Sequence, residues 1–288
     1  MFFTLQNNQL HITVNSFGAE LSSVIKNETE YMWQAEKSIW SRHAPNLFPI
    51  VGKLKNNTFY YEHKNYELPQ HGFARDNEFQ LINQTYDSLV FELVSSEKLL
   101  KNYPFYFSFQ VTYQLIDNTV VQRYQVINKA NAIMYFSVGA HPAFNCPLSL
   151  NEAFEDYELI FPTKEKLTIN TLHEGLISET TIDISLQNNR LPISQQLFNN
   201  DALVFMNNQI NEVQLVSKIS KKGVSLKSHH WPCFGIWTKK QTTHFICLEP
   251  WYGIADFINT TQELKHKKEI ISLKPQQFFN CEFIITFL

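Results

Sequence analysis

The chain has 288 residues, of which 44% are apolar and 14% aromatic, and at this length it can bury a large hydrophobic core. Its 24 Lys and Arg residues are balanced by 27 Asp and Glu residues, so it lacks the cationic field that nucleic-acid binding requires. The eight glycines are too widely spaced to form a dinucleotide-binding or P-loop phosphate motif. The composition therefore predicts a globular protein without a nucleic-acid partner.

The chain carries no signal for secretion or for the membrane. Its N-terminus has no cationic segment followed by an apolar one, and no run of about 18 apolar residues occurs. The cysteines are scattered and form no C-x-x-C pair, which predicts reduced packing residues in the cytoplasm: Cys146, Cys233, Cys247 and Cys281. Because no linker or repeat divides the sequence, we expect residues 1–288 to form a single domain, in a monomer or homodimer.

Alternating apolar and polar residues dominate the sequence and predict strands. The clearest segment is 106–115, in which every second residue from Phe107 to Leu115 is apolar. Similar patterns or β-branched and aromatic runs occur, in chain order, at 9–14, 89–94, 119–126, 245–249, 269–273 and 279–287. A helix is expected over 95–103, ended by Pro104, and a second short one near 194–198. Many strands with few helices predict a large antiparallel all-β sandwich or barrel.

Three segments combine ionisable residues with rigid backbone: 68–76, 137–147 and 246–256. In the last two, His141 and Glu249 each directly precede a proline, which favours extended backbone and a fixed side-chain direction. Each segment also contains one of the few glycines, which suits a tight turn or a close approach of the backbone to a ligand. These segments are therefore candidates for a catalytic site.

Glu249 is the most informative of these residues. In the segment FICLE it shares a strand face with Phe245 and Cys247, and a buried carboxylate is costly unless it is paired. One explanation is a structural ion pair with Arg75 or Arg42, and the other is a general base in a cleft. The pattern alone leaves both open. A single histidine, such as His71 or His141, is by itself more often a satisfied polar residue than a catalyst.

Seven motifs in order along the chain resemble the aldose 1-epimerases, or galactose mutarotases, and within them the shorter bacterial LacX-like group. The motifs are ITVNSFGAELSSV, WSRHAPNLFPIVGKL, YELPQHGFARD, VGAHPAFNCP, LFNNDALVF, FGIWTK and CLEPWYGIAD. The resemblance implies an all-β fold, a large antiparallel β-supersandwich of the galactose mutarotase type with few short helices. It also implies interconversion of the α and β anomers of a free aldohexose, without a cofactor or a metal.

The resemblance also assigns roles to individual residues. It implies that His141 is the general acid and Glu249 the general base. His71 would hydrogen-bond the sugar near its ring oxygen, and Asp201 would bind a hydroxyl group. Arg75 and Trp237 would line the pocket.

One position departs from the family pattern. Many relatives have arginine after the glycine of the FPIVG segment, where this chain has Lys53. An ammonium is a point charge and cannot replace the bidentate fork of a guanidinium. A family contact made by that arginine is therefore not expected to be retained in the same form.

The implied chemistry suits the two residue types. Ring opening removes a proton from the anomeric hydroxyl and delivers one to the ring oxygen. With ordinary pKa values near 4.3 and 6.5, Glu249 would be a carboxylate at neutral pH and His141 would hold a proton at modest cost. Each positioned group typically contributes about 10²–10⁴-fold to the rate.

Four alternatives remain at this stage. A sugar-binding or sensor protein could use the same fold with an idle catalytic pair. An epimerase of hexose 6-phosphates could bind phosphate through basic residues, for which Arg42, Lys53, Lys55 and Arg75 are candidates. A zinc hydrolase would use histidine and glutamate ligands, although no short ligand spacing supports one. A glycosidase would need two carboxylates, which Glu249 and Asp201 could supply.

Overall fold

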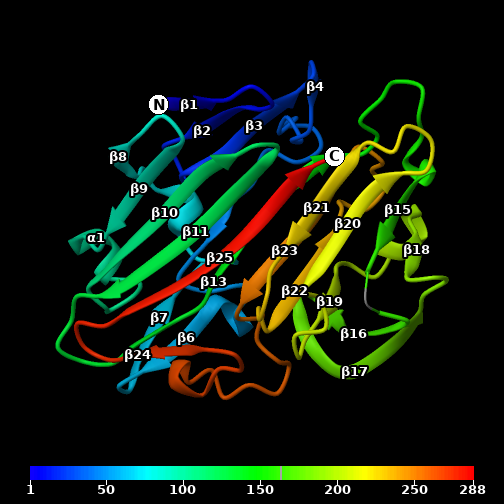
Figure 1. Cartoon of the computed structure of the whole chain (residues 1–288). Helices are drawn as coiled ribbons and strands as arrows, with labels where there is room; N and C mark the ends of the chain where they lie inside the picture. The colour runs from blue at the N-terminus through cyan, green and yellow to red at the C-terminus, as the bar shows by residue number, and fades with distance from the viewer. Residues whose placement is uncertain (163) are drawn as a thin grey trace.

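The computed structural model describes residues 1–162 and 164–288, and strands dominate it. Figure 1 shows the long strands β10, β11 and β25 side by side across the molecule. They belong to a nine-stranded antiparallel sheet, whose strands are, in spatial order, β18 (Arg190–Pro192), β15 (Tyr157–Ile160), β20 (Glu212–Ser217), β21 (Gly223–Lys227), β25 (Phe278–Phe287), β11 (Thr119–Asn128), β10 (Phe107–Ile116), β9 (Ser88–Val94) and β8 (Gln80–Gln84).

An eight-stranded sheet is the second large layer. Its strands are, in spatial order, β17 (Leu176–Ser185), β16 (Lys166–His173), β19 (Leu203–Phe205), β22 (Cys233–Trp237), β23 (Phe245–Tyr252), β13 (Val138–Ala140) and β5 (Asn46–Leu47), with β14 (Ala143–Asn145) also paired to β23. The smaller sheets comprise β1 (Phe2–Gln6), β2 (His11–Asn15), β3 (Glu20–Lys26) and β4 (Thr29–Glu30), then β6 (Thr58–Tyr61) with β7 (Lys64–Glu67), and β12 (Met134–Phe136) with β24 (Ile271–Leu273).

Helices are short and few among the described residues. The α-helix is α1 (Glu97–Leu100), and the 3₁₀ helices are η1 (Lys55–Asn57), η2 (Ala74–Asp76), η3 (Phe154–Asp156), η4 (Gln195–Phe198) and η5 (Leu264–His266). The helix expected over 95–103 is therefore too long. The Ser96 side chain caps its N-terminus, and the chain leaves the helix after Leu100. The second expected helix is η4, a 3₁₀ helix.

The strand predictions are confirmed where alternation is strongest. In β10, Phe107, Phe109, Val111 and Tyr113 are buried, and β11 follows after the two-residue loop Asp117–Asn118. The two large sheets pack face to face. Phe48, next to β5, stacks on Phe109 of β10 with ring centroids 4.6 Å apart. One continuous hydrophobic cluster runs from Leu5 to Phe287. The all-β fold expected from the sequence is thus confirmed.

The eight-stranded sheet also has an outer face, turned away from this core. In β23, Ile246 and Leu248 belong to the core between the sheets. Phe245, Cys247 and Trp251, with the opposite parity, pack in separate apolar clusters. Glu249 has that same parity. The expected shared face is confirmed, and it is the outer one.

No helix in the described part of the chain is long and apolar enough to cross a membrane. All four cysteines are free thiols, as expected.

Candidate active site

Glu249 lies on β23, and its partner is a histidine. The residue is only 1% exposed, and its Oε2 lies 3.1 Å from Nε2 of His141. This contact has the length of an ion pair but lacks the geometry of an aligned hydrogen bond. The structural ion pair with arginine is wrong, because Arg42 and Arg75 both pair with Asp76 instead, at 2.8 and 3.8 Å.

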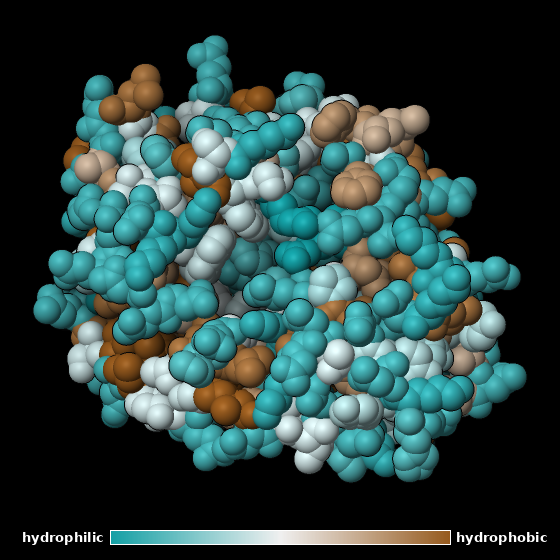
Figure 2. Space-filling model, turned by 180° about the vertical axis from the view of Figure 1, so that it is seen from behind, coloured by the Kyte–Doolittle hydropathy of each residue, from teal (hydrophilic) through white to brown (hydrophobic). Residues whose placement is uncertain are grey.

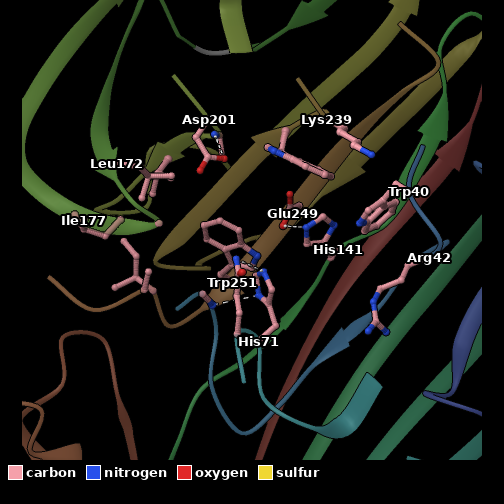
Figure 3. A pocket seen from close by; sticks show the side chains of 18 of the residues that line it. Trp40, Arg42, His71, His141, Leu172, Ile177, Asp201, Lys239, Glu249 and Trp251 are labelled. Atoms are coloured by element: carbon pink, nitrogen blue, oxygen red, sulfur yellow. Dashed lines mark hydrogen bonds and ion pairs between the residues drawn. The ribbon is translucent and has the colours of Figure 1, made fainter. Parts of the chain in front are cut away.

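A backbone hydrogen bond and three neighbouring aromatic rings fix the position of His141. Its backbone N–H donates to Pro45 O at 3.0 Å, directly after β13. Trp40 stacks on the ring with centroids 5.1 Å apart, and Trp237 and His71 meet it edge-on at 5.6 and 5.5 Å. These contacts fix the direction of the imidazole toward Glu249, as the close-up in Figure 3 shows.

Burial reverses the expected protonation of this pair. Loss of solvation, reinforced by the positive charge of Arg75, lowers the pKa of His141 to about 3. Loss of solvation also raises the pKa of Glu249 well above its usual value, and the negative charge of Asp201 adds to that rise. The expectation of a ready carboxylate beside an easily protonated imidazole is therefore wrong for this environment. Both shifts disfavour the charged forms, an imidazolium and a carboxylate.

His71 approaches the pair from a tight turn. It has a φ of 66° and is followed by Gly72 at 72°, where a Cβ would lie 2.3 Å from Phe48 O. The backbone N–H of Gly52 donates to His71 Nδ1 at 3.1 Å, and His71 N–H donates back to Gly52 O at 2.8 Å. Because Nδ1 is an acceptor and burial holds the pKa of His71 well below its usual value, the neutral ring carries its proton on Nε2.

These residues surround a cavity of about 510 Å³ on the outer face of the eight-stranded sheet. Seen from the side opposite to Figure 1, the surface is hollowed near its centre, and hydrophilic residues gather around the hollow (Figure 2). All six site residues expected from the sequence line the cavity: His71, Arg75, His141, Asp201, Trp237 and Glu249. The fold thus brings together residues as far apart in the sequence as His71 and Glu249.

Several lining residues were not predicted as site residues. Besides apolar side chains, they include Trp40, Gln70, Lys239 and Trp251, while Arg42, also in the lining, was a candidate only for binding a phosphate or pairing with Glu249. Trp251 lies two residues after Glu249 in the EPW motif, so strand parity could have found it. Lys239 and Gln70 stand in the motifs FGIWTK and YELPQHGFARD, but the resemblance gave neither residue a role.

Three buried polar atoms at the cavity have no hydrogen-bond or ion-pair partner at short distance among the described residues: Arg75 Nε, His141 Nδ1 and Trp251 Nε1. Buried polar groups are normally satisfied, and each orphan costs about 1–3 kcal/mol. Donors and acceptors thus surround one cavity beside the aromatic faces of Trp40 and Trp237. This combination matches a small ligand with both hydroxyl groups and apolar ring faces.

The remaining expected residues lie at the wall of the cavity. Arg75 donates from Nη2 to Gln70 O at 2.6 Å, and although burial lowers its pKa to about 10, it stays a cation at neutral pH. Asp201, three residues after the end of η4, has a φ of 80°, and its Oδ1 accepts from Ala202 N–H at 2.8 Å. Lys53 does not line the cavity. Its Nζ donates to Glu174 O at 2.9 Å and so anchors the β16–β17 turn.

One group of residues has the composition of a metal site. His141, Cys247 and Glu249 offer ligand atoms within 4.8 Å of one another. A metal needs the thiolate form of cysteine, whereas burial raises the pKa of Cys247 well above its usual value. His71 is not in this group, and its Nδ1 is already engaged by Gly52. The donor set therefore fits zinc poorly.

Comparison with known proteins agrees with this geometry. The family model for aldose 1-epimerase matches residues 1–286, so the chain belongs to the aldose 1-epimerase family. Within that family it is 31% identical to the chromosomal protein LacX of Lactococcus lactis subsp. lactis, over the full length of both chains.

Solved structures agree as well. A galactose mutarotase related enzyme from Lactobacillus acidophilus superposes with a TM-score of 0.96 at 36% identity, covering 100% of this chain and 97% of that one. A galactose mutarotase-like protein from Lactobacillus casei superposes with a TM-score of 0.92 at 26% identity and full coverage of both chains. The fold is therefore of the galactose mutarotase type.

Proposed function

We propose that this protein is an aldose 1-epimerase that interconverts the α and β anomers of a free aldohexose. The observation that carries the proposal is the buried His141–Glu249 pair, 3.1 Å apart, at a cavity with unpartnered polar atoms and aromatic walls. A general acid and a general base side by side are what opening and closing a pyranose ring requires.

The pair balances the protons of the reaction. In the reactive form, the proton is on His141 and Glu249 is a carboxylate. Glu249 takes the proton of the anomeric hydroxyl and C1=O forms as the C1–O5 bond breaks, while His141 protonates O5. Rotation about C1–C2 and the reverse transfers close the ring on the other face.

Burial affects this reaction because it favours one of the two protonation states through which the His141–Glu249 pair passes. The step converts an imidazolium and a carboxylate into a neutral imidazole and a carboxylic acid. That neutral form is the one that desolvation of His141 and Glu249 favours. Burial therefore favours the proton transfers that lead from the charged pair to the open chain, and the proposed steps need no cofactor.

Other residues would bind and orient the sugar. His71 would donate from Nε2 toward the ring oxygen, since Gly52 occupies its Nδ1. Asp201 would accept from a hydroxyl group, Arg75 would donate from its unpartnered Nε, and Trp237 would cover an apolar ring face.

A hexose 6-phosphate is the alternative substrate, and one observation favours it: three cations, Arg42, Arg75 and Lys239, line the cavity. Two of the three are already engaged, because Arg42 donates to Asp76 at 2.8 Å and Lys239 donates to Ile39 O. Arg75 makes only a longer contact with Asp76, at 3.8 Å, which leaves its Nε without a hydrogen bond. Of the other two basic candidates, Lys53 donates to Glu174 O and Lys55 to Ile258 O. These contacts favour the neutral sugar.

Anomer exchange tests the proposal. The rate is measured by exchange NMR or polarimetry for glucose, galactose and their 6-phosphates, with the buffer rate subtracted. We expect saturable acceleration, with the higher kcat/KM for a neutral hexose. No acceleration for any of these sugars would leave only a sugar-binding or sensor protein, and a preference for the phosphates would make the alternative correct.

The proposal extends to the setting of the protein. Four free cysteines, three of them buried, support a reducing compartment such as the cytoplasm. The continuous core from Leu5 to Phe287 supports a single domain over residues 1–288. We propose that it works as a monomer or homodimer, which sedimentation would distinguish.

A further inference from the structure

A buried ion pair lies behind the wall of the catalytic cavity. Lys267, directly after η5, places its Nζ 2.8 Å from Oδ1 of Asp256, and neither side chain is more than 3% exposed. Asp256 follows Ile254 and Ala255, which line the cavity, whereas neither member of the pair lines it. Desolvation of two charges is costly, and apolar residues of similar volume often replace such a pair without loss of stability. Stability alone therefore does not account for the pair.

Asp256 connects this ion pair to a neighbouring segment of the chain. Its Oδ2 accepts from the N–H of Lys55, the first residue of η1, at 2.9 Å. Its backbone N–H donates to Lys53 O at 2.8 Å. While Oδ1 is held by Lys267, two other polar atoms of the same residue thus hold the stretch from Lys53 to Lys55.

The residue before this stretch, Gly52, determines how His71 is held. Gly52 packs so closely against Ala255 that a Cβ on it would lie 2.6 Å from Ala255 Cα. Its N–H donates to His71 Nδ1 at 3.1 Å, and its oxygen accepts from His71 N–H at 2.8 Å. In Figure 3, His71 reaches from the lower part of the view toward the His141–Glu249 pair. Both the position and the tautomer of His71 therefore depend on where the backbone of Gly52 lies.

We propose that Asp256 is a positioning residue, with its charge balanced by Lys267, that holds the Gly52 amide so that His71 presents its Nε2 proton to the sugar. This inference rests on the proposed function and adds two residues to it. Electron density accumulates on O5 as the C1–O5 bond breaks, so a donor aimed at O5 acts more strongly in the transition state than in the ground state. Displacement of His71 therefore lowers kcat and leaves KM nearly unchanged.

Paired double variants isolate the contact to Lys55 without leaving a buried charge unpaired. All carry Lys267→Met. Asp256→Asn keeps an oxygen that can accept from Lys55 N–H, whereas Asp256→Leu has a similar shape and no acceptor. Asp256→Ala is a second variant without an acceptor, in which nothing larger than the original side chain is introduced.

A matched control removes an ion pair of the same residue types elsewhere. Lys166 Nζ lies 2.7 Å from Asp183 Oδ2, and both side chains are more than half exposed. Neither residue lines the catalytic cavity. The control variant combines Lys166→Met with Asp183→Leu.

Two measurements distinguish positioning from a structural role. Anomer exchange gives kcat and KM for glucose at a temperature at which circular dichroism shows each variant to be folded. Nitrogen-15 NMR of the histidine rings shows which ring nitrogen carries the proton, and the His71 signals are assigned by their absence in His71→Gln. A merely structural role would leave both kcat and the His71 signals of the folded protein unchanged.

In the wild type, we expect His71 to be protonated on Nε2 and unprotonated on Nδ1. In the leucine and alanine variants, kcat should fall about tenfold, which corresponds to the loss of about one hydrogen bond, with KM changed less than about twofold. The His71 signals of these variants should move toward a mixture of tautomers. The asparagine variant and the control variant should keep the wild-type signals and most of the wild-type kcat.

The contradicting outcomes are specific. A wild-type His71 protonated on Nδ1 would overturn the inference, and so would unchanged kcat and signals in the leucine and alanine variants. An equal loss in the asparagine variant would also overturn it, as would failure of both acceptor-free variants to fold, because the role would then be structural. Turnover of none of the sugars by the wild type, galactose and the two 6-phosphates included, would instead overturn the proposed function. The His71 signals would still show whether Asp256 positions the ring.

Discussion

The indole ring of Trp251 lies against two glycines on neighbouring strands, Gly235 and Gly139. Any larger residue at either position would collide with the ring. A Cβ on Gly235 of β22 would lie 2.3 Å from Cη2 and 2.4 Å from Cζ2 of the ring, and a Cβ on Gly139 would lie 2.8 Å from Cδ1. Ordinary contacts begin at 3.4 Å. In the variant Gly235→Ala, the ring or strand must therefore move by about 1 Å. Because Gly139 leaves no free space for the ring on its other side, where a Cβ would lie 2.8 Å from Cδ1, the ring shifts toward the cavity that it lines.

The expected magnitudes follow from this displacement. Overpacking of this kind lowers the free energy of unfolding by about 1–3 kcal/mol. A misplacement of about 1 Å beside the reacting groups lowers kcat/KM by up to about 10²-fold. The free energy of unfolding is measured by urea denaturation and kcat/KM by anomer exchange.

A second substitution provides the control. Phenylalanine lacks the outer six-membered ring of the indole, whose atoms Cη2 and Cζ2 cause the collision. In a Trp251→Phe background, Gly235→Ala should therefore cost less than about 0.5 kcal/mol. The reasoning is refuted if Gly235→Ala matches the wild type in stability and activity, or if its cost is the same in both backgrounds.

Three further predictions concern charge. The pH profile of kcat/KM should show no acid limb near pH 6.5, because burial lowers the pKa of His141 to about 3; an inflection near 6.5 would contradict this. The alkaline limb reports loss of the proton from Glu249, whose raised pKa owes part of its shift to Asp201. Asp201→Asn should therefore move that limb to lower pH, and an unmoved or raised limb would show that the two charges do not interact. Lys267→Met should lower the free energy of unfolding by about 3–5 kcal/mol, because it leaves the carboxylate of Asp256 buried without its cation. In the wild type, Asp256 Oδ1 lies 2.8 Å from Lys267 Nζ, and neither side chain is more than 3% exposed. In chemical denaturation, a loss as small as that of Lys101→Met would show that the pair is not needed.

The strands could be predicted because local alternation and burial agree. In β10 and β11, apolar side chains at every second position meet the core between the sheets, and the expected 106–115 differs from the observed Phe107–Ile116 by one residue. The helix over 95–103 was overestimated for a tertiary reason. Tyr103 is buried, and its hydroxyl donates to Tyr135 O. This tertiary contact ends the helix before residue 103.

The candidate site was predictable only where residues sit in recognisable motifs. His71, His141 and Glu249 stand in such motifs and line one cavity. Lys239 also stands in a quoted motif, FGIWTK, and lines the same cavity, but its role was missed because its position depends on how β22 and the residues after it are folded.

The protonation of His141 and Glu249 could not be read from the sequence. It depends on how completely both are removed from water and on the charges of Arg75 and Asp201, which lie far from them along the chain. Strand parity correctly indicated that Glu249 shares a face with apolar residues. It could not indicate which partner the carboxyl group meets.

The central claim is that Glu249 and His141 exchange protons with a sugar, and anomer exchange by Glu249→Gln tests it most directly. The amide keeps the shape of the side chain but cannot accept the proton of the anomeric hydroxyl. Exchange of glucose or galactose should fall about 10²–10⁴-fold in kcat with little change in KM, while the circular dichroism spectrum stays that of the wild type. Turnover near that of the wild type would contradict the account.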